Sequence, residues 1–206
     1  MENCCAWNLP DLDQSNSIVR SYLLSWIKNV VQIYDFDGIR IDTIQEVPKD
    51  FWQEYNTASG VFQMGEVYNE DPAYVGGYQP SVTALFNYPM YFKIRDVFAY
   101  NKSMFEFRVM YDTEDSLFTD VDALGSFMNN HDNPRFLSLT SNWAAFKSAI
   151  TFAMTARGIP FFYYGDEQGF NGGNDPACRE SLWNAMDTNA EVYQYVAKIN
   201  KARKSS

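Results

Sequence analysis

The strongest constraint on the fold is a regular alternation between short apolar segments and longer segments with helical periodicity. The short segments have the length and composition of buried strands, whereas apolar residues in the longer ones recur near the 3.6-residue spacing of a helix. The expected strands are residues 36–41, 61–64, 84–86, 123–128 and 159–164. The expected helices are a segment capped within residues 13–17 that runs to residue 33, and residues 48–60, 89–98, 105–111, 143–156 and 191–203. Such an alternation implies parallel strands joined by right-handed crossovers.

Two architectures accommodate this alternation: an open doubly wound sheet and a closed β/α barrel. A doubly wound dinucleotide-binding sheet carries Gly-x-Gly-x-x-Gly after its first strand, and the sequence contains no such motif. Strands that end in carboxylates suit a barrel instead, because the active site of a barrel collects the carboxyl ends of its strands. A complete barrel needs about 250 residues, and this chain has 206. We therefore predict the α/β class, with residues 1–206 forming one incomplete TIM-type (β/α) barrel domain of about five strands with their helices.

The charge and cysteine content argue against several classes of partner and against a zinc site. The formal net charge is −10, which disfavours nucleic acids and anionic membranes because both bind basic surfaces. No apolar run reaches the roughly 18 residues of a membrane span, and no apolar run follows Met1, so we expect neither a span nor a signal peptide in this chain. The three cysteines, Cys4, Cys5 and Cys178, contain no Cys-x-x-Cys pair, so a zinc site is not expected.

Acidic residues stand at the ends of three expected strands. Arg40 and Asp42 lie two residues apart, so their side chains point to the same side of one strand. Taken alone, this pair could be a satisfied structural ion pair. Glu66 ends the next strand, however, and Asp132 follows a later one, and the carboxyl ends of barrel strands meet on one face. A retaining glycoside hydrolase needs two such carboxyls about 5 Å apart, one as nucleophile and one as proton donor.

Six short motifs resemble those of the α-amylase family of retaining glycoside hydrolases, in the form found in fungal or protist α-amylases. They occur along the chain in the same order as in that family. Residues 37–42 resemble the nucleophile strand, residues 65–67 the acid/base motif, and residues 127–132 the motif of the third carboxylate. The other resemblances are to a short preceding motif (residues 9–13), the last-strand motif (158–167) and a substrate loop (172–180). The match spans about residues 7–200 and is similar to the C-terminal part of the catalytic barrel, so residues 1–13 would be a remnant of the preceding insertion or loop.

The resemblance implies a role for each of the three carboxylates. Asp42 would attack the anomeric carbon of the substrate. Glu66 would protonate the leaving oxygen and then activate water. Asp132 would hold sugar hydroxyls and favour ring distortion. Crowding of the carboxyls would raise one pKa and so keep that acid protonated near neutral pH.

The resemblance also implies four substrate-binding residues. Arg40 would pair with Asp42 and keep it ionised. His131 is the only histidine and would hydrogen-bond sugar hydroxyls. An ordinary loop or core histidine is the alternative, and a Ser-His-Asp triad would need this same residue. Asp175 and Arg179 would contact sugars further along the glucan, with a turn held by a surface ion pair as the alternative.

Calcium is the cofactor that the resemblance implies, although the sequence holds few of its ligands. Asp11 would supply one ligand and the backbone carbonyl of Glu46 another, whereas calcium takes six to eight oxygens. The family's Lys-His pair after the nucleophile is replaced by Gln45-Glu46, which changes the expected binding of sugars beyond the cleavage point. One of Cys4 and Cys5 matches a family cysteine whose disulfide partner would lie upstream, as in a secreted protein.

The function that the resemblance implies is endo-hydrolysis of α-1,4-glucosidic bonds in starch or glycogen with retention, by what would be a truncated form. The expected partner is therefore an α-glucan, with no nucleic acid and no membrane. Two alternatives stay open: a catalytically inactive fragment that at most binds glucan, and an α-glucosidase of the same superfamily. As part of a full-length secreted protein the chain would be extracellular, or lysosomal or vacuolar.

Overall fold

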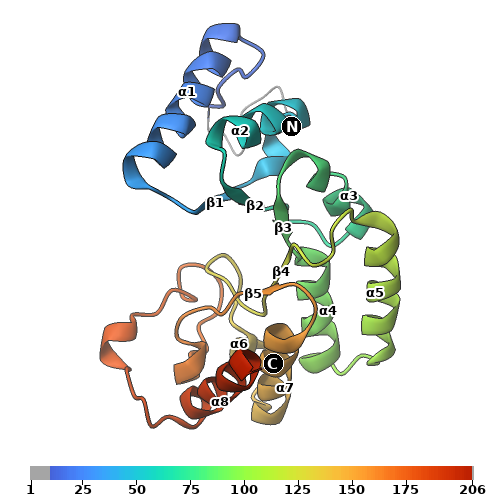
Figure 1. Ribbon diagram of the computed structural model, residues 1–206. Helices are drawn as coiled ribbons and strands as arrows, with labels where there is room; N and C mark the ends of the chain where they lie inside the picture. Colours follow the sequence, from blue (N-terminus) through green and yellow to red (C-terminus); the bar gives the residue numbers. More distant parts are fainter. Residues whose placement is uncertain (1–9, 206) are drawn as a thin grey trace. The chain divides into compact units, whose positions relative to one another are not determined.

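The computed structural model describes residues 10–205, which form two compact units (Figure 1). The first unit contains the residues up to Tyr88 together with Glu114–Leu124. The second contains Pro89–Thr113 together with the residues from Gly125 onward.

The first unit is a parallel sheet of three strands with its connecting helices. The strands are β1 (Gly38–Ile41), β2 (Phe62–Gly65) and β3 (Ala84–Phe86), and the helical segments are α1 (Ser17–Tyr34), η1 (Ile44–Glu46), α2 (Lys49–Ser59), α3 (Pro72–Gly76) and η2 (Gln79–Ser81). The strands lie in the order β1-β2-β3, with Ile41 opposite Gly65 and Gly65 opposite Leu85. This register brings the carboxyl ends of the three strands to the same edge of the sheet.

Local signals in the sequence set the ends of the helices in this unit. The side chain of Asn16 accepts hydrogen bonds from the amides of Ile18 and Val19 and so caps α1. Gly60 caps the C-terminus of α2, and glycine adopts its φ of 67° without steric cost. Helix α1 packs against α2 (Figure 1).

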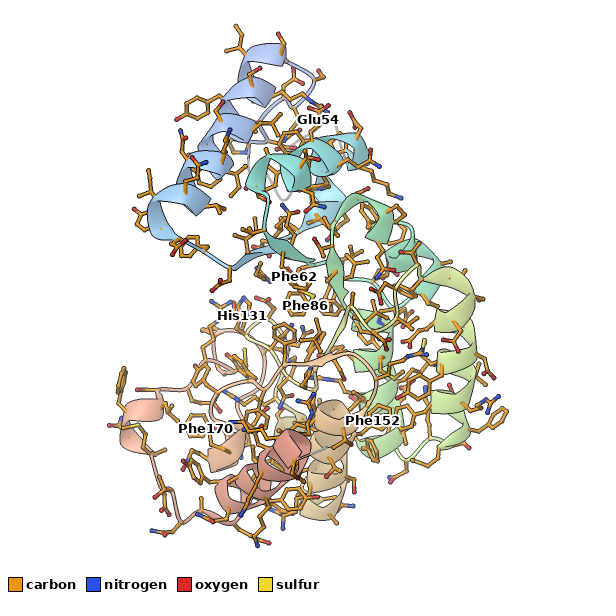
Figure 2. The ribbon with its side chains drawn as sticks, in the orientation of Figure 1. Glu54, Phe62, Phe86, His131, Phe152 and Phe170 are labelled. Carbon is orange, nitrogen blue, oxygen red and sulfur yellow. The ribbon has the colours of Figure 1, made fainter. Side chains whose placement is uncertain are left out.

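The second unit combines a pair of parallel strands with a helical layer. Its strands are β4 (Leu124–Ser126), which enters this unit at Gly125, and β5 (Ile159–Pro160). Its helical segments are α4 (Tyr88–Phe98), α5 (Phe105–Leu117), α6 (Phe136–Leu139), α7 (Trp143–Thr155), η3 (Asp166–Gln168), η4 (Leu182–Asn184) and α8 (Glu191–Ser205). Helix α4 from its second residue and α5 as far as Thr113 belong to this unit. The ring of Phe152, labelled in Figure 2, stacks on that of Phe107 with centroids 4.0 Å apart, which ties α7 to α5. Helix α7 also packs against α8.

The five strands of the described chain occur where the sequence predicts them, but the last is shorter. Residues 161–164 are not a strand, and that part of the prediction is wrong. The amide of Phe161 still donates to the carbonyl of Ser126 at 2.7 Å, after which the chain turns away. The carbonyl of Tyr164 then accepts from the buried Arg135 at 2.8 Å. A buried cation thus satisfies backbone that a neighbouring strand would otherwise satisfy.

Two helices differ from the prediction for identifiable reasons. Helix α5 continues past residue 111 to Leu117, because Glu114 in its polar second half is buried and accepts a hydrogen bond from Asn87 at 2.7 Å. Helix α3 was not predicted, although Asp71 caps it and Pro72 occupies its first turn, a pairing typical of helix starts.

Two further predictions concern a membrane span and the N-terminal residues. Within residues 10–205, no helix has the length and apolar character that crossing a bilayer requires. Cys4, Cys5 and the first nine residues of the predicted N-terminal remnant lie outside the described residues.

Candidate active site

A cluster of charged side chains lies at the carboxyl ends of β1 and β2 in the first unit. The Arg40 guanidinium bridges two carboxylates, with Nη1 2.9 Å from Asp42 Oδ1 and Nη2 2.8 Å from Glu66 Oε2. The parallel register explains this proximity, because the residue after Ile41 and the residue after Gly65 leave paired strand ends together. The sequence-predicted nucleophile and proton donor are therefore neighbours, joined by one cation.

The environment of Glu66 suits a carboxyl that holds its proton. The side chain of Glu66 is 7% exposed, whereas that of Asp42 is 68% exposed. Burial is the main cause that raises the pKa of Glu66 above its ordinary value, and a hydrogen bond with Asp42 raises it further. The hydroxyl of Tyr88, which donates to Glu66 Oε1 at 2.6 Å, and the charge of Arg40 lower this pKa but do not cancel the rise. A carboxyl with a raised pKa beside a more exposed carboxylate is the division of labour that general acid catalysis needs.

Backbone contacts hold the two carboxylates in register. The amide of Glu66 donates to the carbonyl of Ile41 at 2.9 Å, and the carbonyl of Glu66 accepts from the amide of Ile44 at 3.0 Å. Between these two bonds the chain reverses at Thr43, which adopts the left-handed conformation with φ 43°. A β-branched residue in that conformation is an outlier of the sort that often marks a functional site.

Gly65 is required where it stands because the strand end is closely packed. A Cβ atom at this position would lie 2.7 Å from Ile44 Cδ1 and 3.3 Å from Leu85 Cδ2. Ile44 and Leu85 have no exposed surface and cannot move away freely. The glycine before Glu66 thus permits the close approach of β2 to the turn after β1.

A second polar cluster contains the other predicted site residues and lies in the second unit. His131, labelled in Figure 2, places Nε2 3.2 Å from Asp132 Oδ2. Arg179 Nη2 lies 3.3 Å from Asp132 Oδ1, and Arg179 Nε lies 2.8 Å from Asp175 Oδ1. Arg179 Nε also donates to the carbonyl of His131 at 2.9 Å. Arg179 thus joins the loop after β4 to the Gly-rich loop. Its side chain and that of Asp175 are each about half exposed.

Arg135 supports this second cluster and was not singled out from the sequence. It has no exposed surface, and its Nη1 lies 2.9 Å from Asp166 Oδ1 while its Nε lies 2.6 Å from Glu180 Oε2. Its Nε also donates to the carbonyl of Cys178 at 3.1 Å. The signal was present in the sequence, since Arg135 follows Asp132 closely and Glu180 follows Arg179, but neither residue ends a strand.

Asp166 is the buried carboxylate at the centre of this support. Asn129 Nδ2 donates to Asp166 Oδ1 at 2.9 Å, on the same oxygen that Arg135 contacts. Burial raises the pKa of Asp166 to about 7, against the lowering effects of Asn129 and Arg135. Asp166 therefore binds a proton more readily than an exposed aspartate does.

Comparison with known proteins identifies the family of the chain that carries these two clusters. The family model described as the alpha amylase catalytic domain matches residues 3–206. The chain belongs to the α-amylase family. Alpha-amylase 1 of Lipomyces kononenkoae is 41% identical over 197 residues, which cover 95% of this chain and 32% of that protein. The α-amylase of Saccharomycopsis fibuligera is 39% identical over 200 residues, which cover 96% of this chain and 40% of that protein.

Solved α-amylase structures share the fold. The α-amylase of Malbranchea cinnamomea superimposes with a TM-score of 0.92 at 37% identity, covering 95% of this chain and 42% of that one. The α-amylase of Geobacillus thermoleovorans, solved in complex with acarbose, superimposes with a TM-score of 0.90 at 33% identity, covering 100% of this chain and 48% of that one. The chain thus spans between 32% and 48% of the length of these relatives. The predicted family and the predicted partial TIM-type α/β barrel are both confirmed.

The α-amylase site predicted from sequence is divided between the two units. Arg40, Asp42 and Glu66 lie together in the first, and Asp132 lies with the three other predicted binding residues in the second. The roles of these residues, and the convergence of all three carboxylates on one face, remain predictions.

The predicted calcium ligands of the α-amylase family are less complete. Asp11 is exposed and accepts a hydrogen bond from Gln14 Nε2 at 3.3 Å. Glu46 ends η1, and its Oε2 is buried without a hydrogen-bond partner among residues 10–205. Within residues 10–205, no three His, Cys, Asp or Glu side chains form a group able to hold a metal ion. Calcium takes six to eight oxygens, so the described residues alone do not fit a calcium site.

Proposed function

We propose that this chain carries catalytic machinery of an endo-acting α-amylase, which hydrolyses α-1,4-glucosidic bonds in starch or glycogen with retention of configuration. The observation that carries this proposal is the bridge from Asp42 through Arg40 to the buried Glu66. One carboxylate in this arrangement is accessible and paired with a cation, and the other has a raised pKa. A double displacement needs these two groups in those two states.

The chemistry follows from the two carboxyl groups. Asp42 Oδ attacks the anomeric carbon and forms a glycosyl ester, while the proton of Glu66 passes to the departing glycosidic oxygen. Glu66, now ionised, takes a proton from water, and the resulting hydroxide attacks the anomeric carbon and releases Asp42. We assign Asp132 and His131 to the hydroxyls of the reacting sugar, and Asp175 and Arg179 to sugars further along the α-glucan.

Two other functions are distinguishable from this one. An inactive relative would bind glucan without hydrolysing it. The intact Asp42–Arg40–Glu66 bridge argues against this alternative. An α-glucosidase would release single glucose units from chain ends. The resemblance of residues 172–180 to the substrate loop of fungal α-amylases favours internal cleavage. The chain's similarity to the acarbose-bound α-amylase of Geobacillus thermoleovorans supports an α-glucan-type ligand in either case.

Calcium and location belong to the same proposal. Because the described residues do not complete a calcium site, we assign to this chain only Asp11 and the backbone carbonyl of Glu46 as ligands, the remainder coming from other parts of an α-amylase domain. The expected location of the full-length protein is extracellular, lysosomal or vacuolar.

The stereochemistry of the first product tests the proposed function. The full-length protein should release α-anomeric sugar from a maltooligosaccharide, because two displacements at one carbon restore its configuration. Proton NMR in the first minutes, before mutarotation, resolves the α- and β-anomeric signals. A β-anomeric first product would remove Asp42 from the nucleophile role. Glucose as the sole early product would favour the α-glucosidase.

A further inference from the structure

We propose that Tyr88 is a positioning residue for Glu66, a role that rests on the proposed function of Glu66 as proton donor. The Tyr88 hydroxyl donates to Glu66 Oε1 at 2.6 Å, while Arg40 Nη2 lies 2.8 Å from Glu66 Oε2. Each carboxyl oxygen is therefore held by a different donor. Two donors on two oxygens fix both the position and the rotation of the carboxyl plane.

The Tyr88 side chain is itself held firmly. It is 1% exposed, and its ring packs edge to face against the ring of Tyr68, with centroids 4.9 Å apart and planes at 75°. Tyr88 begins α4, directly after β3, and the pairing of Gly65 with Leu85 brings the residue after β2 beside the end of β3. The preceding residue, Asn87, donates to the buried Glu114 at 2.7 Å and fixes the backbone at this point.

The chemistry of the contact gives it a measurable sign. A phenol hydroxyl that donates to a carboxylate stabilises the ionised form and lowers the carboxyl pKa. The charged groups that act on Glu66 from the neighbouring strand are Arg40, which also lowers its pKa, and Asp42, which raises it. Tyr88 and Arg40 are thus the two groups that lower the pKa of Glu66 against the effect of burial, and Tyr88 is the uncharged one. Removing its hydroxyl should leave Glu66 protonated to a higher pH.

Tyr88→Phe removes the hydroxyl and keeps the ring. The direct measurement is a pH titration of the Glu66 carboxyl carbon by NMR in selectively labelled protein, with the signal assigned by its loss in Glu66→Gln. We expect the midpoint in Tyr88→Phe to rise by roughly one pH unit, the size expected for a hydrogen bond to a charged group. Tyr55→Phe is the matched control, because Tyr55 packs against Trp52 in the same unit. Its midpoint should equal that of the unchanged protein.

A fluorinated tyrosine at position 88 tests the opposite direction and covers the case in which Tyr88→Phe does not fold. Its phenol is more acidic and donates more strongly, so the Glu66 midpoint should fall. Opposite shifts from the two substitutions are the result that a merely structural role of Tyr88 would not give. Unmoved midpoints in both would overturn the proposal.

Turnover separates this proposal from the proposed function. In the full-length protein, the alkaline limb of kcat/KM against pH should move upward in Tyr88→Phe, because that limb reports the acid that must be protonated. If the NMR midpoints shift as expected and no form hydrolyses starch, Tyr88 positions Glu66 and the proposed function fails. If starch is hydrolysed while midpoint and limb stay fixed, the function stands and the role of Tyr88 is overturned.

Discussion

Asp42→Asn should lower kcat for starch by about 10⁴-fold or more in the full-length protein, as expected when a covalent nucleophile is lost. The amide has nearly the shape of the carboxylate, so the fold and the neighbouring Arg40 are retained. It cannot, however, attack the anomeric carbon or stabilise positive charge there. Release of reducing ends from soluble starch measures the change directly.

Asp37→Asn is the matched control for this substitution. Asp37 is exposed, and it precedes β1 in the same motif that Asp42 ends. The chemical change is identical, yet turnover should stay within about twofold of the unchanged protein, because Asp37 is exposed and lies at the opposite end of β1 from Asp42. Retention of more than a few per cent of turnover in Asp42→Asn would contradict the nucleophile assignment.

Arg135→Met should cost about 3–5 kcal/mol of the free energy of unfolding at pH 8, where Asp166 is ionised, as expected when a buried ion pair loses one partner. Arg135 has no exposed surface and faces both Asp166 and Glu180, so its removal leaves carboxylates without a cation. Methionine fills much of the volume, which limits any contribution from a cavity. Urea unfolding followed by tryptophan fluorescence gives the difference.

The same variant should show a characteristic dependence on pH. The folded chain holds a proton on Asp166 up to about pH 7, whereas the ordinary value is 3.8. Between these values the folded state binds more protons, so the contribution of Asp166 to stability falls as pH rises through 7. Without Arg135 the pKa of Asp166 should rise further, so that fall should continue above pH 7. The loss of stability should therefore be larger at pH 8 than at pH 5, where protonation removes the unpaired charge.

Arg20→Met provides the contrast between buried and exposed ion pairs. Arg20 pairs with Asp50 at 3.0 Å and with Glu54 at 2.9 Å, and Glu54 is labelled in Figure 2. Both carboxylates are more than half exposed, so solvent screens the pairs and the substitution should cost only about 0–1 kcal/mol. Equal losses in Arg20→Met and Arg135→Met would show that the Arg135 network does not stabilise the second unit.

Periodicity and motif order were sufficient to predict the strands and the family, because both depend on local patterns. Asp42 and Glu66 were found because each directly follows a strand, and their contact through Arg40 follows from the parallel register. The strand predicted at residues 161–164 is absent because Tyr163 and Tyr164 place their rings against the buried Arg135, and the carbonyl of Tyr164 accepts from it instead of from a strand.

Tyr88 and Arg135 show why the rest of the site could not be predicted from the sequence. Tyr88 precedes Pro89 and has the appearance of an ordinary helix start, and only the pairing of β2 with β3 reveals that its hydroxyl meets Glu66. Arg135 has partners 29 to 45 residues away along the chain. No local pattern records contacts of that separation.

The most direct test of the account is to trap the glycosyl ester that it requires. A 5-fluoroglycosyl fluoride of the α-gluco series loses fluoride without needing a proton, and its second fluorine slows hydrolysis of the ester. After incubation with the full-length protein, mass spectrometry of the peptides should find one glycosyl adduct, on Asp42, and none in Asp42→Asn. An adduct on Glu66 or Asp132, or rapid turnover of the reagent with no adduct at all, would contradict the assignment of Asp42 as the nucleophile.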